Sequence, residues 1–562
     1  MTTDSAERTA HAADTLATAP EPVASEREPP SGLIRSTAIV SAATTASRFL
    51  GLIREQLFAA LLGAGMWADA FVVAFRIPNL LRDLFAEGAL SAAFVPTFAK
   101  VEKEAGPEEA HALANELVGA LLVIVGVLTL LGAIFAEQLV FLLASGFFEV
   151  PGKAELTALL ARIMMPFLLA LSLAAVMMGM LNARRVFGTP ALAPAMFNLT
   201  AIAVGVALRL AGASDRTAVI GWSIGTLCGG VAQFAVQLPS LRRFGYAFRP
   251  RLRALWRDPN LRRIALLMAP ATLGLAATEA NIFINTQFAS QQPGANAWLN
   301  YAFRVMYVPI GIFGVAVATV TTTRLARSAA ERDLGAMKAG LGQGLSLIGF
   351  LALPSMIGLA VLAEPVIRLL YQYGRFTPED ARHTALALAG YALGLFAYSG
   401  IKVAAPAFYA LNRPRVPLLG SVMAVVANLA LNLLLFERIG YLGLAIGTSL
   451  GAWLNFSILA TAFGRHTRDH RLPRGFFREL AKMFLCAASM GLAVWGALRF
   501  CDALLADAGL DHGSFAIKLV RALGGVGVGI LVYGLLSHLL RVEMLAQTSD
   551  AIRRKLKRGQ AR

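Results

Sequence analysis

Long apolar runs without charged residues recur along most of the chain. The longest lie at residues 117–136, 163–183, 186–208, 217–241, 339–363, 416–436 and 439–464. Each is about 20 residues or longer, the length a helix needs to cross a hydrocarbon core of roughly 30 Å. Weaker runs lie near 264–288, 383–401, 483–498 and 522–540, and three further apolar segments carry charges. The pattern predicts an all-α, polytopic membrane protein with about fourteen transmembrane helices.

The three charged segments place ionisable side chains where the bilayer is expected. A charge at mid-bilayer is unfavourable by about 2.5 to more than 10 kcal/mol, so it persists only beside a partner or a water-filled cavity. Arginines outnumber carboxylates deep in these segments, which favours an anionic ligand in a polar cavity. The residues are Arg48, Arg54 and Glu55 in segment 45–65, Asp69, Arg76 and Arg82 in segment 66–88, and Arg304 in segment 297–317.

Composition and charge distribution support a membrane protein. The chain is 57% hydrophobic with a mean hydropathy of +0.62, whereas soluble domains are nearer about 45–50% apolar. The net charge of +17 does not indicate nucleic-acid binding, because the basic residues favour alternate loops such as 242–263. By the positive-inside rule, this distribution predicts a multi-pass protein with both termini in the cytoplasm. Three cysteines, Cys228, Cys486 and Cys501, lack metal or redox spacing.

An internal repeat with a spacing of 228 to 230 residues divides the chain. Ala74–Arg76 matches Ala302–Arg304, the segment 181–186 matches 411–416, and Asn198 matches Asn428. Six helices in each half predict a parallel repeat, and transporters often bind substrate between such halves. The expected units are a disordered cytoplasmic tail (1–33), an N-lobe with helices 1–6 (34–245), a C-lobe with helices 7–12 (246–477), two added helices (478–541) and a basic tail (542–562).

Helical spacing leaves two interpretations of the charged segments open. Arg48 and Glu55 share a helical face, and so do Asp69 and Arg76, so these four could simply pair with one another.

Pairing of those four still leaves Arg54, Arg82 and Arg304 on three helices. A guanidinium stays charged and presents a planar fork of donors that suits phosphate. We therefore expect a phosphate-bearing ligand, although Arg82 could instead extend to the lipid headgroups or pair with Asp83 or Glu87.

Four stretches of sequence resemble the MurJ (MviN) lipid II flippases of the multidrug/oligosaccharidyl-lipid/polysaccharide exporter superfamily. The likeness runs from about residue 36 to the end of helix 12. It implies two six-helix lobes around a central cavity, with two extra helices that form a lipid groove. The stretches are SRFLGLIREQ, ADAFVVAFRIPNLLRDLFAEGALSAAFVP, YGRFT at 373–377 and KVAAPAFYA at 402–410.

The resemblance also implies which residues bind the substrate. One departure is Tyr307, where some relatives have a carboxylate. The matching positions are the arginines Arg48, Arg54, Arg82 and Arg304, together with Asp69, Ser47, Asn79, Glu87, Pro194 and Asn198.

Some relatives are thought to hold a sodium ion between helices 7, 11 and 12, where Asn428, Asn432 and Thr448 match in position. Asn432 replaces a carboxylate, which weakens a site for a hard cation. Glu279 is a lone carboxylate in helix 7 that could bind a proton, a cation or an arginine. No cofactor is expected, and the driving force stays open between a proton, a monovalent cation and the membrane potential.

The implied function is translocation of lipid II, an undecaprenyl diphosphate-linked disaccharide-pentapeptide, across the bacterial inner membrane for cell-wall biogenesis. Such a protein is a transporter and not an enzyme; its partners would be membrane lipids and could include the cell-wall synthesis machinery. One alternative is export of another polyprenyl-linked glycan or of drugs. Another is a membrane-embedded enzyme acting on polyprenyl lipids, for which acid–base candidates are Asp502, Asp507, Asp511 and His512.

Overall fold

The computed structural model describes residues 30–85, 88–251, 258–466, 475–507 and 513–547, and the elements assigned there are all helices. The first half contains α2 (Pro30–Leu62), α3 (Met66–Phe85), α4 (Gly88–Ala105), α5 (Pro107–Ile134), α6 (Ala136–Leu143), η1 (Ser145–Glu149), α7 (Lys153–Met164), α8 (Pro166–Ala183), α9 (Gly188–Leu210), α10 (Asp215–Ala235) and α11 (Leu238–Arg243). The second half contains α12 (Pro259–Ala289), α13 (Ala295–Pro309), η2 (Ile310–Gly314), α14 (Val315–Ala330), α15 (Leu334–Val361), α16 (Ala363–Tyr371), α17 (Pro378–Ala392), α18 (Leu395–Ala410), α19 (Arg415–Ile439), α20 (Tyr441–His466), α21 (Phe476–Asp507) and α22 (Phe515–Leu539).

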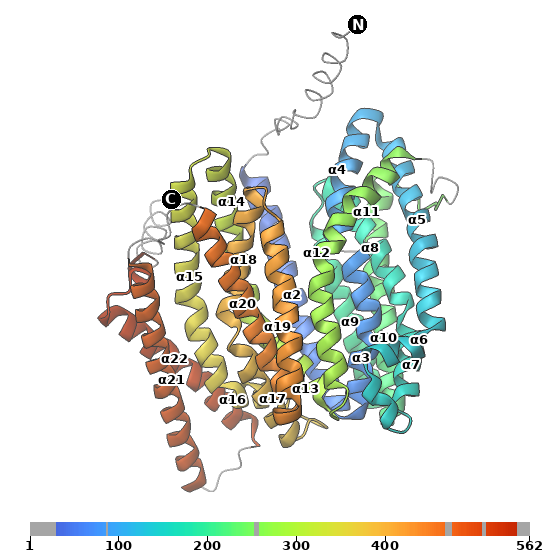
Figure 1. The fold of residues 1–562 in the computed structure, drawn as a ribbon. Coiled ribbons are helices and arrows are strands. Elements are labelled where there is room, and N and C mark those ends of the chain that lie inside the picture. The colour runs from blue at the N-terminus through green and yellow to red at the C-terminus, as the bar shows by residue number, and fades with distance from the viewer. Residues whose placement is uncertain (1–29, 86–87, 252–257, 467–474, 508–512, 548–562) are drawn as a thin grey trace.

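The long helices run up and down side by side and form one bundle (Figure 1). We call the end where α2 begins and α22 ends the near end, and the opposite end the far end. The junction of α4 with α5 lies at the near end, whereas α16 and the start of α17 lie at the far end. The bundle therefore has two chemically distinct ends, and the basic loops at 184–185, 324–332 and 413–415 lie at the near end.

Ten helices or helix pairs of the described part are long and apolar enough to cross a membrane, or eleven if α17 and α18, bent by 42°, form one span. The fourteen expected from sequence are reached only by adding α2, α3 and α12. These three carry the charges discussed above or lie at the boundary between the lobes. On α2 and α3, charged residues that serve the interior of the bundle lower the apolarity of the helix.

Proline breaks two of the spans. Pro166 opens α8 directly after α7, and Pro309 ends α13, after which the chain makes the π-helical turn η2 before α14. Proline lacks an N–H and clashes with the preceding turn, so a helix that continues past it must change its hydrogen bonding. The π turn lies about two to three turns after Arg304, on the span that carries this residue.

Helix α12 crosses from one lobe to the other. Near its start, Leu261 and Ile264 are buried in the same apolar core as Phe94 and Phe98 of α4. Towards its other end, it packs against α19 and α20. The two lobes therefore share α12 along their boundary.

The chain just before α12 also stays on the first lobe. The Tyr246 hydroxyl donates to Asn115 Oδ1 at 2.8 Å, and the Arg251 amide donates to the Asn115 carbonyl at 3.1 Å. Burial raises the pKa of Tyr246, which keeps this hydroxyl protonated and able to donate. Residues 246–251, expected in the C-lobe, thus pack on α5 of the N-lobe.

Helices α21 and α22 lie beside the second lobe (Figure 1). They pack against each other, α21 packs against α15, and α22 packs against α16. Lys518 fixes the start of α22, since its Nζ donates to the Gln372 carbonyl at 2.8 Å. Their outer surface remains apolar: Leu492 of α21 and Leu531 of α22 are each more than 70% exposed. Such a surface suits contact with lipid.

Candidate binding cavity

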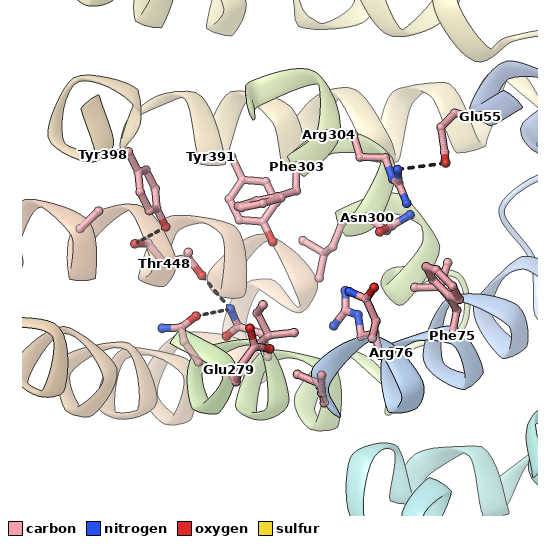
Figure 2. Close-up of a pocket in the computed structure, with 18 of the residues that line it drawn as sticks. Glu55, Phe75, Arg76, Glu279, Asn300, Phe303, Arg304, Tyr391, Tyr398 and Thr448 are labelled. Atoms are coloured by element: carbon pink, nitrogen blue, oxygen red, sulfur yellow. Dashed lines mark hydrogen bonds and ion pairs between the residues drawn. The ribbon is translucent and has the colours of Figure 1, made fainter. Parts of the chain in front are cut away.

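A cavity of about 420 Å³ lies between the lobes, lined by residues of α2, α3, α9, α10, α12, α13 and α17–α20. Its charged lining residues are Arg54, Glu55, Arg76, Glu279 and Arg304. Three arginines against two carboxylates leave a net charge of +1. Figure 2 shows Arg304 and Arg76 entering the cavity from different helices, with Asn300 between them in this view. The interior is therefore polar and positive inside an apolar bundle.

Glu55 binds two of these arginines at once. Its Oε1 accepts from Arg304 Nη1 at 2.9 Å and from Arg54 Nη2 at 2.5 Å, and Glu55 is 8% exposed. The Arg54 guanidinium also lies over the Phe197 ring, 5.0 Å from its centre. One interpretation of the sequence paired Glu55 with Arg48, which shares its helical face, but the ion pairs of Glu55 are with Arg54 and with Arg304 of α13.

Arg76 is a cavity residue. Its Nη1 donates to the Thr286 hydroxyl of α12, and it does not pair with Asp69 as one interpretation expected. Arg76 and Arg304, which the proposed repeat relates, line the cavity from the two lobes. The sequence argument missed this role because the spacing of Asp69 and Arg76 suggested an internal ion pair.

Asp69 lies at the far end, completely buried and away from the cavity lining. Its Oδ2 accepts from Lys153 Nζ at 2.9 Å and from the Gly294 amide at 2.7 Å, and its Oδ1 accepts from the Ala297 amide at 2.9 Å. These amides belong to the N-terminus of α13, where a carboxylate is favoured by free N–H groups and by the helix dipole. Asp69 thereby joins the N-lobe to the C-lobe.

Glycine is required at position 294. Its φ is +83°, in the left-handed region, and a Cβ would lie 2.7 Å from the Trp298 ring. This conformation lets the Gly294 amide point at Asp69, so the turn before α13 is shaped for the carboxylate.

Further bonds close the far end between the lobes. The Ser145 amide donates to Gln287 Oε1 at 3.0 Å, and the Gly146 amide donates to Ser290 Oγ at 3.2 Å. The Arg375 side chain pairs with Asp215 at the start of α10. Together with Asp69, these contacts hold the two lobes against each other beyond the cavity.

The remaining predicted substrate residues fall in three places. Asn79 lines the cavity. Arg82 is half-buried on the same helix, and Arg48 is exposed on α2, with its Nη1 near Gly311. Neither Arg48 nor Arg82 belongs to the cavity lining, and Glu87 lies outside the described residues.

Asn198 and Ser47 connect two helices of the N-lobe. The Asn198 side chain donates to the Ser47 carbonyl at 3.0 Å, and Asn198 is 8% exposed. This bond holds α9 against α2, next to Gly51, and Pro194 lies inside α9. The two residues thus position the helix that carries Arg54.

The expected cation site is a network of neutral side chains. Asn432 Nδ2 donates to Asn285 Oδ1 at 2.7 Å and to Asn428 Oδ1 at 3.1 Å, while Asn285 Nδ2 donates to Thr448 Oγ1 at 2.8 Å. Within the described ranges, no group of three or more His, Cys, Asp or Glu residues could hold a metal ion. The amide nitrogens named here find acceptors within the cluster, whereas Asn432 Oδ1 is buried without a hydrogen-bond partner. The cluster offers a cation no carboxylate of its own.

Sequence reasoning missed Asn285 and Lys153. The pair Asn281 and Asn285, four residues apart on an otherwise apolar stretch of α12, was a usable signal for a polar helix face. Lys153 gave no signal, because it follows a Pro-Gly turn in a loop that resembles any exposed loop.

The residues suggested for an enzyme do not form a described catalytic group. Asp502 pairs with Arg521 at 2.8 Å, and Asp511 and His512 lie outside the described residues. Asp507 is the last residue of α21 and is exposed.

In sequence, the chain is similar to proteins of one family. A sequence model described as "Lipid II flippase MurJ" matches residues 58–507. A lipid II flippase MurJ of Burkholderia cenocepacia is 35% identical over 477 residues, covering 83% of this chain and 91% of the relative. A protein of Rhizobium meliloti, described as a probable lipid II flippase MurJ, is 34% identical and covers 94% of this chain and 97% of its own length.

Two solved structures are similar in fold. A lipid II flippase MurJ in an inward closed conformation has a TM-score of 0.73 at 25% identity, covering 90% of this chain and all of that chain. An inward-facing multidrug resistance transporter of the MATE family, from the MOP superfamily, has a TM-score of 0.63 at 16% identity, covering 76% and 94%. The second likeness concerns the fold alone.

Proposed function

Because this chain belongs to the MurJ family of lipid II flippases, a family of transporters, we propose that it moves lipid II by alternating access with the diphosphate held by Arg54, Arg76 and Arg304. The observation that carries the proposal is the placement of these three arginines on three helices around one cavity. A diphosphate needs several charge-assisted donors at once, and guanidinium forks supply them.

Glu55 acts as the counter-ion of two cavity arginines. It bonds to both Arg54 and Arg304, which would otherwise be two uncompensated charges inside the bundle. An arriving diphosphate carries more negative charge and more acceptor oxygens than one carboxylate, so it can displace Glu55 from the guanidiniums. The exchange keeps the arginines paired throughout.

Arg82 and Arg48 serve the approach to the cavity. Each lies six residues from a cavity arginine on its own helix, which places it about 9 Å closer to the near end. A diphosphate entering from that end would meet Arg48 and Arg82 before it meets Arg54 and Arg76.

Loading requires the lobes to move. A cavity of about 420 Å³ lies within the range that holds a drug-sized ligand, roughly 300–1,000 Å³. A disaccharide-pentapeptide with its diphosphate is larger than such a ligand. The near end must therefore open for entry, and the bonds of Asp69, Ser145 and Arg375 at the far end must break for release.

Direction follows from charge. The near end carries the arginine-rich loops, so by the positive-inside rule it faces the cytoplasm of the bacterial inner membrane. Substrate then enters from the inner leaflet and leaves at the far end, with its polyprenyl chain outside the cavity beside the apolar surface of α21 and α22.

Glu279 is the residue that couples transport to its driving force. It lines the cavity on α12, the helix shared by both lobes. The neighbouring amide network is neutral, which favours a proton or the membrane potential over sodium as the drive. Protonation of Glu279 would raise the positive charge of the cavity while substrate is bound.

The arginines can be tested by binding and transport. Alanine at Arg54, Arg76 or Arg304 removes charge-assisted bonds of about 1.5–3 kcal/mol, so affinity for lipid II should fall about 10- to 100-fold. Lysine should restore part of the loss, because it keeps the charge and lacks the fork. Transport of labelled lipid II in proteoliposomes should fall in parallel.

Arg438→Ala, an exposed arginine at the end of α19, is the matched control and should behave as wild type. Wild-type transport by all three cavity variants would contradict the proposal.

A further inference from the structure

A second cavity of about 580 Å³ lies at the near end, apart from the cavity between the lobes. It is bounded by the end of α14, the start of α15, the start of α21 and the segment that follows α22. In that segment, Val542 and Met544 are buried and fix its position. None of the residues that line the central cavity takes part, so the two cavities are separate.

The floor of the pocket is a face of α15 whose residues are small except for Gln343. Ala336, Ala339, Gly340, Gln343 and Ser346 recur at three- and four-residue spacing and share one face of the helix. A Cβ on Gly340 would meet only Leu325 Cδ2, at 3.9 Å. The floor is therefore open because its side chains are short, and a larger side chain at position 340 would fill the pocket.

The walls of the pocket carry charges of both signs. Arg324 and Arg327 come from α14, and Glu331 follows them directly after this helix. Glu479 and Glu543 come from α21 and the segment after α22. Helix α15 packs against both α14 and α21, so the arginines and Glu479 reach the pocket from two different neighbours of α15.

Existing bonds hold these side chains in place and leave donors for a ligand. Arg324 Nη1 donates to Gln343 Oε1 at 3.0 Å, and Arg327 Nε donates to Glu331 at 2.8 Å. A guanidinium has further N–H donors beyond one such bond. Glu479, only 7% exposed, accepts from Lys482 Nζ at 2.6 Å and from the Glu543 amide at 3.1 Å.

Apolar surface continues from the pocket along α21. Phe476 lines the pocket, and Phe477, Phe484 and Leu485 are 71%, 52% and 57% exposed along the helix. In a membrane-spanning helix, such residues face acyl chains. A ligand with a charged head and apolar chains matches both parts.

We propose that this pocket binds the headgroup of a zwitterionic phospholipid with a primary ammonium group, such as phosphatidylethanolamine. Arg324 and Arg327 bind the phosphate, and Glu479 and Glu543 accept hydrogen bonds from the ammonium. A primary ammonium has N–H donors for carboxylates, whereas a quaternary ammonium has none. The bound lipid links α14 to α21 across α15 and so fastens the two added helices to the second lobe. The proposal does not depend on which substrate the central cavity carries.

Binding of short-chain lipids to the purified full-length protein tests this site. Native mass spectrometry and the midpoint of thermal unfolding would be followed with phosphatidylethanolamine, phosphatidylcholine and phosphatidylglycerol. We expect phosphatidylethanolamine to bind about tenfold more tightly than either of the others. The double variant Arg324→Gln/Arg327→Gln should weaken binding of all three lipids, because each carries a phosphate. The pocket-filling variant Gly340→Leu should remove the preference for phosphatidylethanolamine.

Glu543→Gln separates the two halves of the headgroup. It should weaken binding of phosphatidylethanolamine and leave phosphatidylglycerol unchanged, because only the first has an ammonium. The control Arg413→Gln/Arg415→Gln makes the same charge change in an exposed near-end loop and should keep the wild-type preference.

Three results would overturn the proposal. Equal binding of phosphatidylglycerol and phosphatidylethanolamine would indicate a site for anionic lipid. Equal binding of all three lipids would indicate that only acyl chains are recognised. An unchanged preference in Gly340→Leu, with its unfolding midpoint retained, would place the lipid elsewhere.

Discussion

The contact between Asp69 and the N-terminus of α13 predicts that Asp69→Asn opens the far end of the protein. The carboxylate accepts from the amides of Gly294 and Ala297 across the lobe boundary and from Lys153 within its own lobe. Asparagine keeps one acceptor oxygen, but its NH2 group faces backbone or lysine N–H donors where the carboxylate had its second oxygen. Lys153, which is 2% exposed, then keeps a positive charge beside the positive end of a helix.

The size of the effect follows from the bonds that are lost. Hydrogen bonds to a charged group contribute about 1.5–3 kcal/mol, and neutral ones about 0.5–1.5 kcal/mol. Asp69→Asn loses one of the two hydrogen bonds across the lobe boundary, and the other changes from a charge-assisted to a neutral bond. Together these changes destabilise the closed far end by roughly 2–4 kcal/mol. At about 1.4 kcal/mol for each factor of ten, the population of the open form rises roughly 30- to 700-fold.

Accessibility of a cavity residue measures this shift. Asn300 lines the cavity, and Asn300→Cys can be labelled from outside the cell with a membrane-impermeant maleimide. We expect labelling at least about tenfold faster in Asp69→Asn than in its parent. All variants in this test also carry Cys228→Ala, Cys486→Ala and Cys501→Ala, so that the reagent cannot label a native cysteine.

Two matched variants complete the test. Lys153→Met keeps the carboxylate and both backbone bonds, so its far end should stay closed. The double variant Asp69→Asn/Lys153→Met no longer has a buried lysine without a counter-ion, so it is less prone to misfold than Asp69→Asn alone. Its cavity cysteine should still be labelled fast. Slow labelling of the double variant, or equally fast labelling of Lys153→Met, would refute the assignment of Asp69 to lobe closure.

Further predictions address the cavity and the topology. Glu55→Gln should tighten binding of lipid II about tenfold and slow its release, because no anion then competes for the arginines; weaker binding in titration calorimetry would contradict this. Glu279→Gln should abolish the pH dependence of transport in vesicles; an unchanged rate and pH profile would exclude coupling through this residue. Asn432→Asp should make the unfolding midpoint rise with sodium, by up to about 2.7 kcal/mol of stabilisation at a hundredfold excess over Kd, whereas the wild type should not respond. Impermeant reagents should label Gln291→Cys from outside and fail to label Arg249→Cys; the reverse pattern would invert the proposed orientation.

The sequence was informative where a charge conflicts with its surroundings. Arg54, Arg304 and Glu279 stand in apolar stretches, and burial of an ion is so unfavourable that a polar cavity follows from their presence. All three line that cavity, as does Asn79. The helices themselves follow from run length, except that α12 carries too mixed a pattern to reveal that it belongs to both lobes.

Partner choice could not be predicted, because helical spacing specifies a face and not what the face meets. Arg48 shares a face with Glu55, yet Glu55 binds Arg304 from the other lobe. Asp69 is bound by a lysine 84 positions later and by backbone amides of α13. Backbone donors carry no sequence signal, so a carboxylate that binds a helix N-terminus resembles any other buried carboxylate until the fold is known.

The ion pair of Asp69 with Lys153 lies entirely within one lobe, on α3 and α7. When α13 withdraws, the carboxylate therefore leaves with its counter-ion and is never stranded alone in a medium of low dielectric constant. A bare buried ion would add several kcal/mol to the separation and would make each opening slow. With the pair kept intact, separation at this contact breaks only hydrogen bonds, which water can replace as it enters. The same closure can thus be firm at rest and still reversible in every transport cycle.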